Sequence, residues 1–136
     1  MSDRRKHRAT GRTEVGTYVP TTFDEVAGGP SLVEVHLTET FRGDIEGEST
    51  VRVLQAVARD GSASFVGVQR VRGSIGGRTG SFLLQPSGTL AGKVTKAEWF
   101  VVPGSGTGDL QGLRGEGGFE AQLGEHGSYW LDYDLQ

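Results

Sequence analysis

Apolar and polar residues alternate along much of this chain, and that alternation predicts β-strands. Between Val33 and Phe41 every second residue but one is apolar, and the residues between them are polar. A period of two places these apolar side chains on one face of an extended strand, which we expect over Ser31–Arg42. The same pattern predicts strands at Ile45–Ala58 and Ser128–Leu135.

Glycine-rich turn signals separate the predicted strands at hairpin spacing. Asp60-Gly61 is a strong hairpin dipeptide. It leads into two strand-like runs, Phe65–Val71 and Ser81–Gln85, which flank a glycine-rich corner at Gly73–Gly80. A further turn is expected at Ser87-Gly88. One long strand, Thr89–Val102, should follow it.

The remaining segments complete an all-β pattern without helical periodicity. Pro103–Leu113 is irregular, and strands are expected at Arg114–Gln122 and Ser128–Leu135, for a total of seven or eight. Sequential antiparallel strands must hide their edges, either in a two-sheet sandwich or in a closed barrel. The regular meander and the glycines inside strands favour the barrel. We therefore predict a single closed or nearly closed antiparallel β-barrel of about eight strands over residues 9–136, after a disordered basic tail at 1–8.

Glu39 interrupts the apolar face of Ser31–Arg42. A carboxylate within an apolar row is costly unless it is paired or protonated. The residue therefore marks either a cavity or the point at which the row reaches solvent. Because strand ends and rims carry charges routinely, the sequence favours the strand end.

Composition narrows the classes of function. The 136 residues fit one domain, and 35% apolar and 23% charged residues fit a folded, soluble protein. The absence of cysteine excludes disulfides and thiolate chemistry. A net charge of −3 argues against a nucleic-acid partner. The N-terminal residues lack an apolar run of signal-peptide or membrane length, so we expect a cytoplasmic protein without a membrane partner. The short basic cluster, Arg4, Arg5, Lys6 and Arg8, is expected to be a solvated arm.

No metal or nucleotide cofactor is expected. His36 lies two residues from Glu34 on one strand face, but no third ligand is identifiable, so His36 is interpreted as a surface imidazole. The glycine-rich segment Gly104–Asp109 lacks both the Lys-Ser/Thr pair and the helix of a phosphate loop. It is interpreted as a turn.

The sequence gives only weak support for acid–base or nucleophilic catalysis. Asp44, Glu46 and Glu48 point to one side of a strand, and in a dry pocket their repulsion would raise one pKa. The opposite face is more apolar, which favours a wet outer face for these carboxylates. No serine lies in a nucleophile elbow. An aromatic-walled pocket therefore remains the main candidate, although small barrels usually fill their interior with side chains.

Several segments resemble a family of small bacterial proteins, domain of unknown function 3224. They include Gly43-Asp-Ile-Glu-Gly-Glu48, Gly76-Gly-Arg-Thr-Gly-Ser-Phe82 and Val101-Val-Pro-Gly-Ser-Gly-Thr-Gly-Asp-Leu110, and the resemblance runs from about Ala9 to Leu135. It implies an antiparallel barrel similar to plant allene oxide cyclase and distantly like dirigent proteins. Such barrels guide cyclisations of reactive hydrophobic substrates.

Three positions depart from the pattern associated with that family. Gln69 stands where Glu is expected, Pro86 where His is expected, and Tyr18 where Trp is expected. An acid–base pair at the first two positions is therefore absent. The resemblance then implies that shape and aromatic stacking are the means of action.

Two functions follow as expectations. The first is a small-molecule-binding barrel, as a cofactor-independent cyclase or isomerase acting on a hydrophobic, natural-product-type substrate. The second is a non-catalytic binding or oligomeric structural protein with a filled barrel. Apolar residues on both faces of several strands also predict a homo-oligomer, either dimer or trimer. No catalytic residue is assigned, and the substrate-binding candidates are Tyr18, Glu48, Phe65, Gln69, Arg78, Phe82, Trp99 and Tyr133.

Two of these candidates depend on open alternatives. Glu48 would line the interior only if its strand turned the carboxylates inward. Arg78 would either anchor a carboxylate or carbonyl group at the rim, or pair with Asp109 or Glu116 and so pin two loops together.

Overall fold

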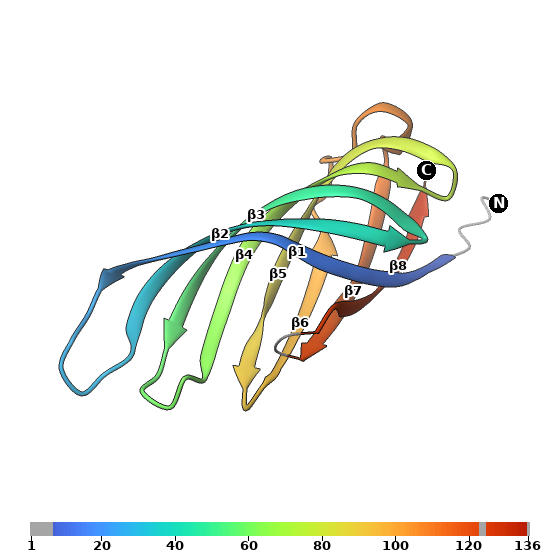
Figure 1. Cartoon of the computed structure of the whole chain (residues 1–136). Coiled ribbons are helices and arrows are strands. Elements are labelled where there is room, and N and C mark those ends of the chain that lie inside the picture. Colours follow the sequence, from blue (N-terminus) through green and yellow to red (C-terminus); the bar gives the residue numbers. More distant parts are fainter. Residues whose placement is uncertain (1–6, 123–124, 136) are drawn as a thin grey trace.

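The computed structural model describes residues 7–122 and 125–135, which form eight antiparallel strands closed into a barrel (Figure 1). Each strand pairs with the next along the chain, and β8 pairs with β1. This arrangement confirms the predicted all-β barrel. The elements are β1 (His7–Asp24), β2 (Ser31–Gly43), β3 (Ile45–Val57), β4 (Ala63–Ile75), β5 (Arg78–Ala91), β6 (Val94–Val101), the 3-10 turn η1 (Gly108–Leu110), β7 (Leu113–Gln122) and β8 (Gly127–Leu135).

The structure changes two of the predicted turns, one in length and one in position. The glycine corner at Gly73–Gly80 contracts to Gly76-Gly77, where φ is +60° and +78°, and β4 and β5 run through the other glycines. The prediction of a turn at Ser87-Gly88 was wrong. Gly88 lies inside β5 opposite Ala97, and a Cβ atom at Gly88 would lie 2.8 Å from that of Ala97. This glycine permits close strand contact, and the chain turns later, between Ala91 and Val94.

The N-terminal residues of the described chain already belong to the barrel. β1 begins at His7. Arg8 forms a bidentate ion pair with Asp132 on β8, with 2.7 Å between Nε and Oδ1 and 2.8 Å between Nη2 and Oδ2. The other members of the basic cluster, Arg4, Arg5 and Lys6, lie outside the described residues. The described part of the chain contains no helix capable of crossing a lipid bilayer.

Closure between β1 and β8 covers only part of β1. Their pairing runs from His7 opposite Tyr133 to Thr13 opposite Gly127, and beyond Thr13 the strand pairs with β2 alone. Figure 1 shows β1 and β2 projecting past β7 and β8. The barrel therefore has a closed half, at the β2–β3 and β4–β5 turns, and an open half, at the β1–β2 and β3–β4 loops.

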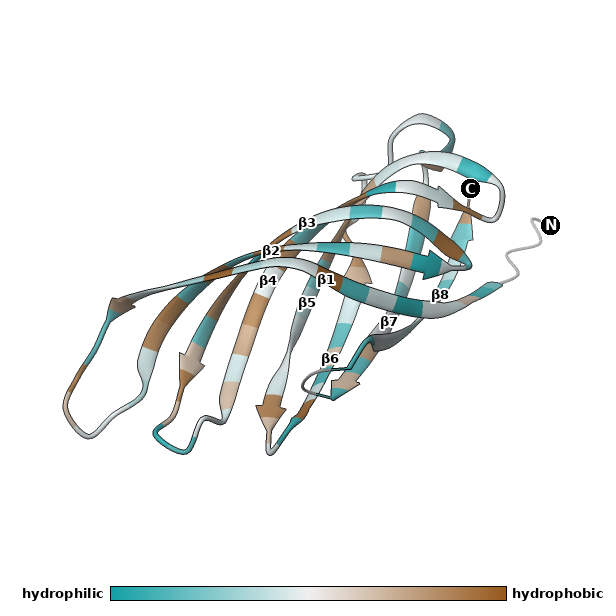
Figure 2. Ribbon diagram, in the orientation of Figure 1, coloured by the Kyte–Doolittle hydropathy of each residue, from teal (hydrophilic) through white to brown (hydrophobic). Residues whose placement is uncertain are grey.

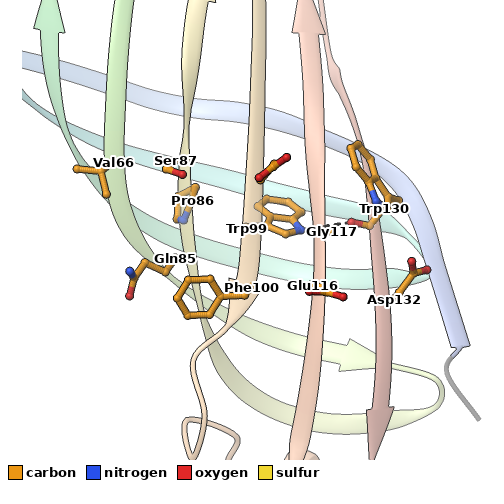
Figure 3. Close-up of a pocket in the computed structure, with 11 residues that line it drawn as sticks. Val66, Gln85, Pro86, Ser87, Trp99, Phe100, Glu116, Gly117, Trp130 and Asp132 are labelled. Atoms are coloured by element: carbon orange, nitrogen blue, oxygen red, sulfur yellow. Dashed lines mark hydrogen bonds between the residues drawn. The ribbon is translucent and has the colours of Figure 1, made fainter.

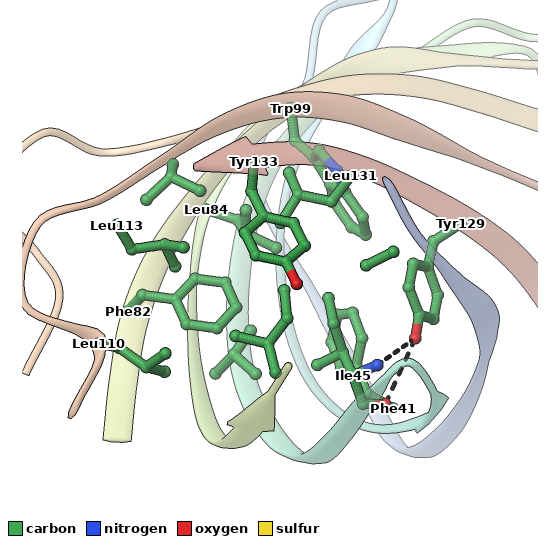
Figure 4. Close-up of a cluster of buried hydrophobic side chains, with 14 residues drawn as sticks. Phe41, Ile45, Phe82, Leu84, Trp99, Leu110, Leu113, Tyr129, Leu131 and Tyr133 are labelled. Atoms are coloured by element: carbon green, nitrogen blue, oxygen red, sulfur yellow. Dashed lines mark hydrogen bonds between the residues drawn. The ribbon is translucent and has the colours of Figure 1, made fainter. Parts of the chain in front are cut away.

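Apolar side chains pack solidly inside the closed half. Phe41, Trp99 and Tyr129 form an aromatic group with ring centroids 5.3–6.4 Å apart (Figure 4). Figure 2 shows the alternation of hydrophilic and hydrophobic residues along the strands that produces this interior. The cluster contains Ala9, Phe41, Ile45, Val71, Ile75, Phe82, Leu84, Trp99, Val101, Leu110, Leu113, Tyr129, Leu131 and Tyr133.

A second, smaller cluster lines the open half. Its buried members are all valines from β2 and β3, and larger side chains, Leu37 and Phe65 among them, pack partly buried against them. Val33, Val35, Val51 and Val53 form the buried part. The interior is therefore divided into a filled end and an end that is only partly covered.

Candidate functional site

A layer of polar side chains separates the two apolar clusters inside the barrel. It consists of Glu39 on β2, Ser49 on β3 and Gln69 on β4. Glu39 lies directly opposite Ser49, and Gln69 lies opposite Val51 on the same three-stranded section. Ser49 and Gln69 are 4% and 1% exposed, whereas Glu39 is partly exposed. We refer to Glu39, Ser49 and Gln69 as the polar layer.

The amide group of Gln69 organises this layer. Its Nε2 donates to Glu39 Oε1 and to Ser49 Oγ, both at 2.9 Å. The Ser49 hydroxyl in turn donates to the main-chain oxygen of Glu39 at 3.3 Å. Within residues 7–122 and 125–135, no protein donor reaches the other carboxylate oxygen, Oε2. One oxygen of Glu39 is therefore held by the protein and the other is available to a ligand.

Burial in the apolar interior raises the pKa of Glu39 from its ordinary 4.5 to about 6, although the hydrogen bond from Gln69 acts in the opposite direction. The Gln69 amide and the Ser49 hydroxyl are neutral, so neither compensates a negative charge. At neutral pH the carboxylate is mostly ionised and lacks a cationic partner among the described residues. This is the arrangement expected of a group that binds a polar ligand atom or transfers a proton.

The strand-end interpretation of Glu39 was wrong. β2 continues to Gly43, and Phe41, two residues beyond Glu39, is fully buried. The carboxylate therefore lies inside the barrel between apolar neighbours. The broken alternation was the signal for this site. Ser49 was missed, because a serine on a strand face carries no such signal.

Three of the predicted binding residues lie in or near the open half. Gln69 belongs to the polar layer, and Phe65 packs partly buried against the valine cluster. Tyr18 lies opposite Leu37, on the inner side of β1, and is 54% exposed. Since directly opposite residues share a sheet face, Tyr18 borders the open half.

Three other candidates are part of the filled core. Phe82, Trp99 and Tyr133 are 1%, 3% and 8% exposed and belong to the closed-half cluster (Figure 4). Alternation correctly placed them inside. Their neighbours in that cluster fill the interior around them, and Trp99 also borders a groove on the outer face of β5–β8 (Figure 3).

The two charged candidates lie outside the interior. Glu48 is exposed on the outer face, because its neighbour Ser49 takes the inward position. The inward orientation on which its selection depended is therefore wrong. Arg78 is exposed at the β4–β5 turn, at the other end of the barrel from the open half.

The remaining polar residues considered from the sequence have structural positions. Glu46 accepts a hydrogen bond from Gly43 N–H at 3.1 Å, within the β2–β3 turn. His36 Nε2 lies 3.3 Å from Glu34 Oε1 on the exposed outer face, in agreement with a surface imidazole. The described chain contains no group of three or more side chains suited to hold a metal ion.

A groove of about 560 Å3 crosses the outer face of β5–β8 (Figure 3). Phe100 and Trp130 form its apolar walls, and Trp130 extends over Gly118, where a Cβ atom would lie 2.8 Å from the indole ring. Its carboxylates are Glu98, Glu116 and Asp132, and Asp132 is already paired with Arg8. The polar layer is the stronger candidate site, because it holds a carboxylate inside the apolar interior.

Comparison with known proteins identifies the family. A solved structure of a protein with unknown function from the DUF3224 family, from Shewanella oneidensis MR-1, is 30% identical with a TM-score of 0.82, over 97% of this chain and 99% of that chain. No protein with a curated function matches. The similarity to allene oxide cyclase is not tested by these findings and stays a prediction. Residues 9–133 match the family described as "Protein of unknown function (DUF3224)", and the chain belongs to that family.

Proposed function

We propose that this barrel binds a small, largely apolar molecule in its open half, and that Glu39 and Gln69 hold the molecule's polar group. One observation carries the proposal. A carboxylate that the described protein holds by one oxygen, Oε1 of Glu39, lies at the boundary between a solid core and a partly covered apolar half. Small-molecule sites commonly combine apolar walls with a few placed polar groups.

The walls of the open half fit an apolar ligand body. Val33, Val35 and Val53 supply the floor, and Phe65 packs beside them. Val15 lies opposite Glu39 on the inner side of β1, yet it is 58% exposed. A bound hydrocarbon would remove this exposed apolar surface from water, which is favourable.

A single proton transfer is the chemistry that Glu39 could add to binding. A carboxyl group with a pKa of about 6 can act as acid or base near neutral pH. Moving one proton within a substrate suits an isomerase, or a cyclase whose apolar cavity shapes the substrate. Neither activity requires a metal or a nucleotide.

The alternative, a non-catalytic barrel with a filled interior, draws its support from the closed half. There Phe41, Trp99 and Tyr129 occupy the space that a ligand would need. If side chains filled the open half in solution as completely as they fill the closed half, no room would remain for a ligand. The barrel would then be a non-catalytic binding or structural module for other proteins. The two functions therefore differ in what the open half admits.

Self-association, to a dimer or trimer, is part of the same proposal. Leu54, Val66 and Val68 expose 53%, 48% and 47% of their surface on the outer face of β3 and β4. Exposed apolar patches favour protein contacts. Analytical ultracentrifugation measures the oligomeric state, and a strictly monomeric protein would contradict this part.

Binding can be tested with the neutral apolar fluorophore Nile red and a matched pair of variants. Val15→Trp places a large side chain at the open half, whereas Val19→Trp makes the same change on the outer side of β1, opposite His36. The two valines are similarly exposed, at 58% and 56%. We expect Nile red fluorescence to rise on binding to the natural protein and to Val19→Trp, and to fall sharply with Val15→Trp. Equal binding by both variants, or none by the natural protein, would refute the proposal.

A further inference from the structure

Resting on the proposed function, we propose that the bound molecule is an amphipathic amine, whose ammonium group pairs with Glu39 while its hydrocarbon body lies in the open half. This names the chemical class of ligand for a site whose ligand is otherwise undefined.

The negative charge of Glu39 has no ion-pair partner within residues 7–122 and 125–135. Its inward neighbours on the packed strands include Val15, Ser49, Val51 and Gln69, none of which carries a charge, and the next inward residue of β1 is the phenol Tyr18, opposite Leu37. Among the described residues, no lysine, arginine or histidine nitrogen forms an ion pair with this carboxylate. An ionised carboxylate in apolar surroundings is unfavourable without a partner. A cationic ligand would supply that partner.

The hydrogen bonds define what the ligand must offer. Oε1 already accepts from Gln69, whose Nε2 also donates to Ser49, so the amide has no further N–H group for Oε2. Oε2 is therefore available to a donor group of a ligand. A hydroxyl group would donate but leave the charge uncompensated, and a carboxylate would be repelled. An ammonium group both donates and neutralises.

The apolar walls restrict the rest of the molecule. Most of this wall is apolar, with Val33, Val35, Val53 and Phe65 among its members. The polar side chains on the same inner face include Gln55, opposite Val33, and Tyr18, opposite Leu37, and neither carries a carboxylate. A second ammonium group would find no carboxylate on these walls and would lose its hydration there, which is unfavourable. The favoured ligand therefore has one amine and a hydrocarbon body.

Binding of an amine should depend on pH through Glu39 itself. The ammonium group requires the ionised carboxylate, so affinity should fall about tenfold when the pH is lowered one unit below the pKa of Glu39. A neutral amphiphile should show the opposite trend or none. This difference separates pairing with the carboxylate from general hydrophobic binding.

Three compounds with the same hydrocarbon chain provide the test: decylamine, decanol and decanoate, each competing with Nile red at neutral pH. We expect decylamine to compete at least about tenfold more strongly than decanol, as a compensated charge would require, and decanoate to compete least. Glu39→Gln should abolish the preference for the amine. Glu48→Gln, on the outer face of β3, should retain it.

The outcomes separate this inference from the proposed function. If decanol competes as well as decylamine, or if the preference survives Glu39→Gln, the amine assignment is wrong and the binding function stands. If Nile red itself does not bind to the natural protein, the proposed function is wrong, and the amine assignment falls with it.

Discussion

Gln69 on β4 donates a hydrogen bond to Glu39 on β2 across the intervening strand β3, with 2.9 Å between Nε2 and Oε1. The two side chains meet because both point into the barrel, where the curvature of the sheet brings inward side chains of β2 and β4 close together. The contact holds one carboxylate oxygen inside an apolar interior, and the same amide reaches Ser49 on the strand between them. The stability and the proposed binding of this barrel both depend on these three side chains.

Replacing Glu39 with Gln should remove a pH-dependent part of the stability. The pKa of Glu39 is about 6 in the folded protein, above its ordinary 4.5, so the folded chain holds this proton more tightly than the unfolded chain. The stabilisation is complete below the lower pKa and is lost as the pH rises through the higher one, a change of about 2 kcal/mol. Urea denaturation of both proteins at acidic and neutral pH measures the difference.

Glu48→Gln is the control for that experiment, because Glu48 is exposed on the outer face of the adjacent strand. It should leave the pH dependence of the natural protein unchanged. Parallel stability profiles for the natural protein and Glu39→Gln would show that Glu39 does not titrate abnormally.

Substitutions at Gln69 should raise the pKa of Glu39 further. Gln69→Leu removes the hydrogen bond that favours the ionised carboxylate. Gln69→Glu places a second carboxyl group within hydrogen-bonding distance, where the pair will share a proton and one pKa will rise strongly. A 13C NMR titration of the carboxyl groups measures both effects. Gln85→Leu, on the exposed outer face of β5, is the control, and a lower pKa for Glu39 in Gln69→Leu would contradict the prediction.

Tyr129→Phe should destabilise the closed half. The Tyr129 hydroxyl accepts from Ile45 N–H at 2.9 Å (Figure 4) and donates to Arg42 O at 3.0 Å, so it satisfies main-chain groups beside the β2–β3 turn. Removing it leaves a buried N–H group unpaired, at a cost of about 1–3 kcal/mol. Chemical denaturation measures the loss. The exposed Tyr18→Phe should change stability by less than about 0.5 kcal/mol, and equal effects at both positions would refute the assignment.

Gly73→Ala should weaken the pairing of β3 with β4. A Cβ atom at Gly73 would lie 2.7 Å from Gly47 Cα and would also collide with the main-chain oxygen of Glu46, so the two strands would have to separate. Overpacking of this kind costs about 3 kcal/mol. Thermal denaturation measures the cost, with Ser74→Ala as the neighbouring control. A stability equal to that of the control would show that the strands can adjust.

Local patterns in the sequence were sufficient for most of the architecture. Alternation predicted Ser31–Arg42 and Ile45–Ala58, which agree with β2 and β3 within one residue at each end. Alternation and turn signals depend on residues that are close together in the sequence. They can therefore be recognised without a three-dimensional structure. The turn between Ala91 and Val94 escaped detection because Gly88 offered a competing signal.

The candidate site was only partly accessible from the sequence. Alternation placed Gln69 on an inner face, and the broken row indicated that Glu39 was unusual. The sequence by itself determined most of the strands, the all-β meander and which side chains share a strand face, but not the boundary between β5 and β6. Only the tertiary structure decided that Glu39 meets Gln69, because their contact joins residues 30 apart on strands that are not neighbours. Such a contact depends on the register of two strand pairs and on the curvature that closes the barrel, and neither is specified by a local pattern.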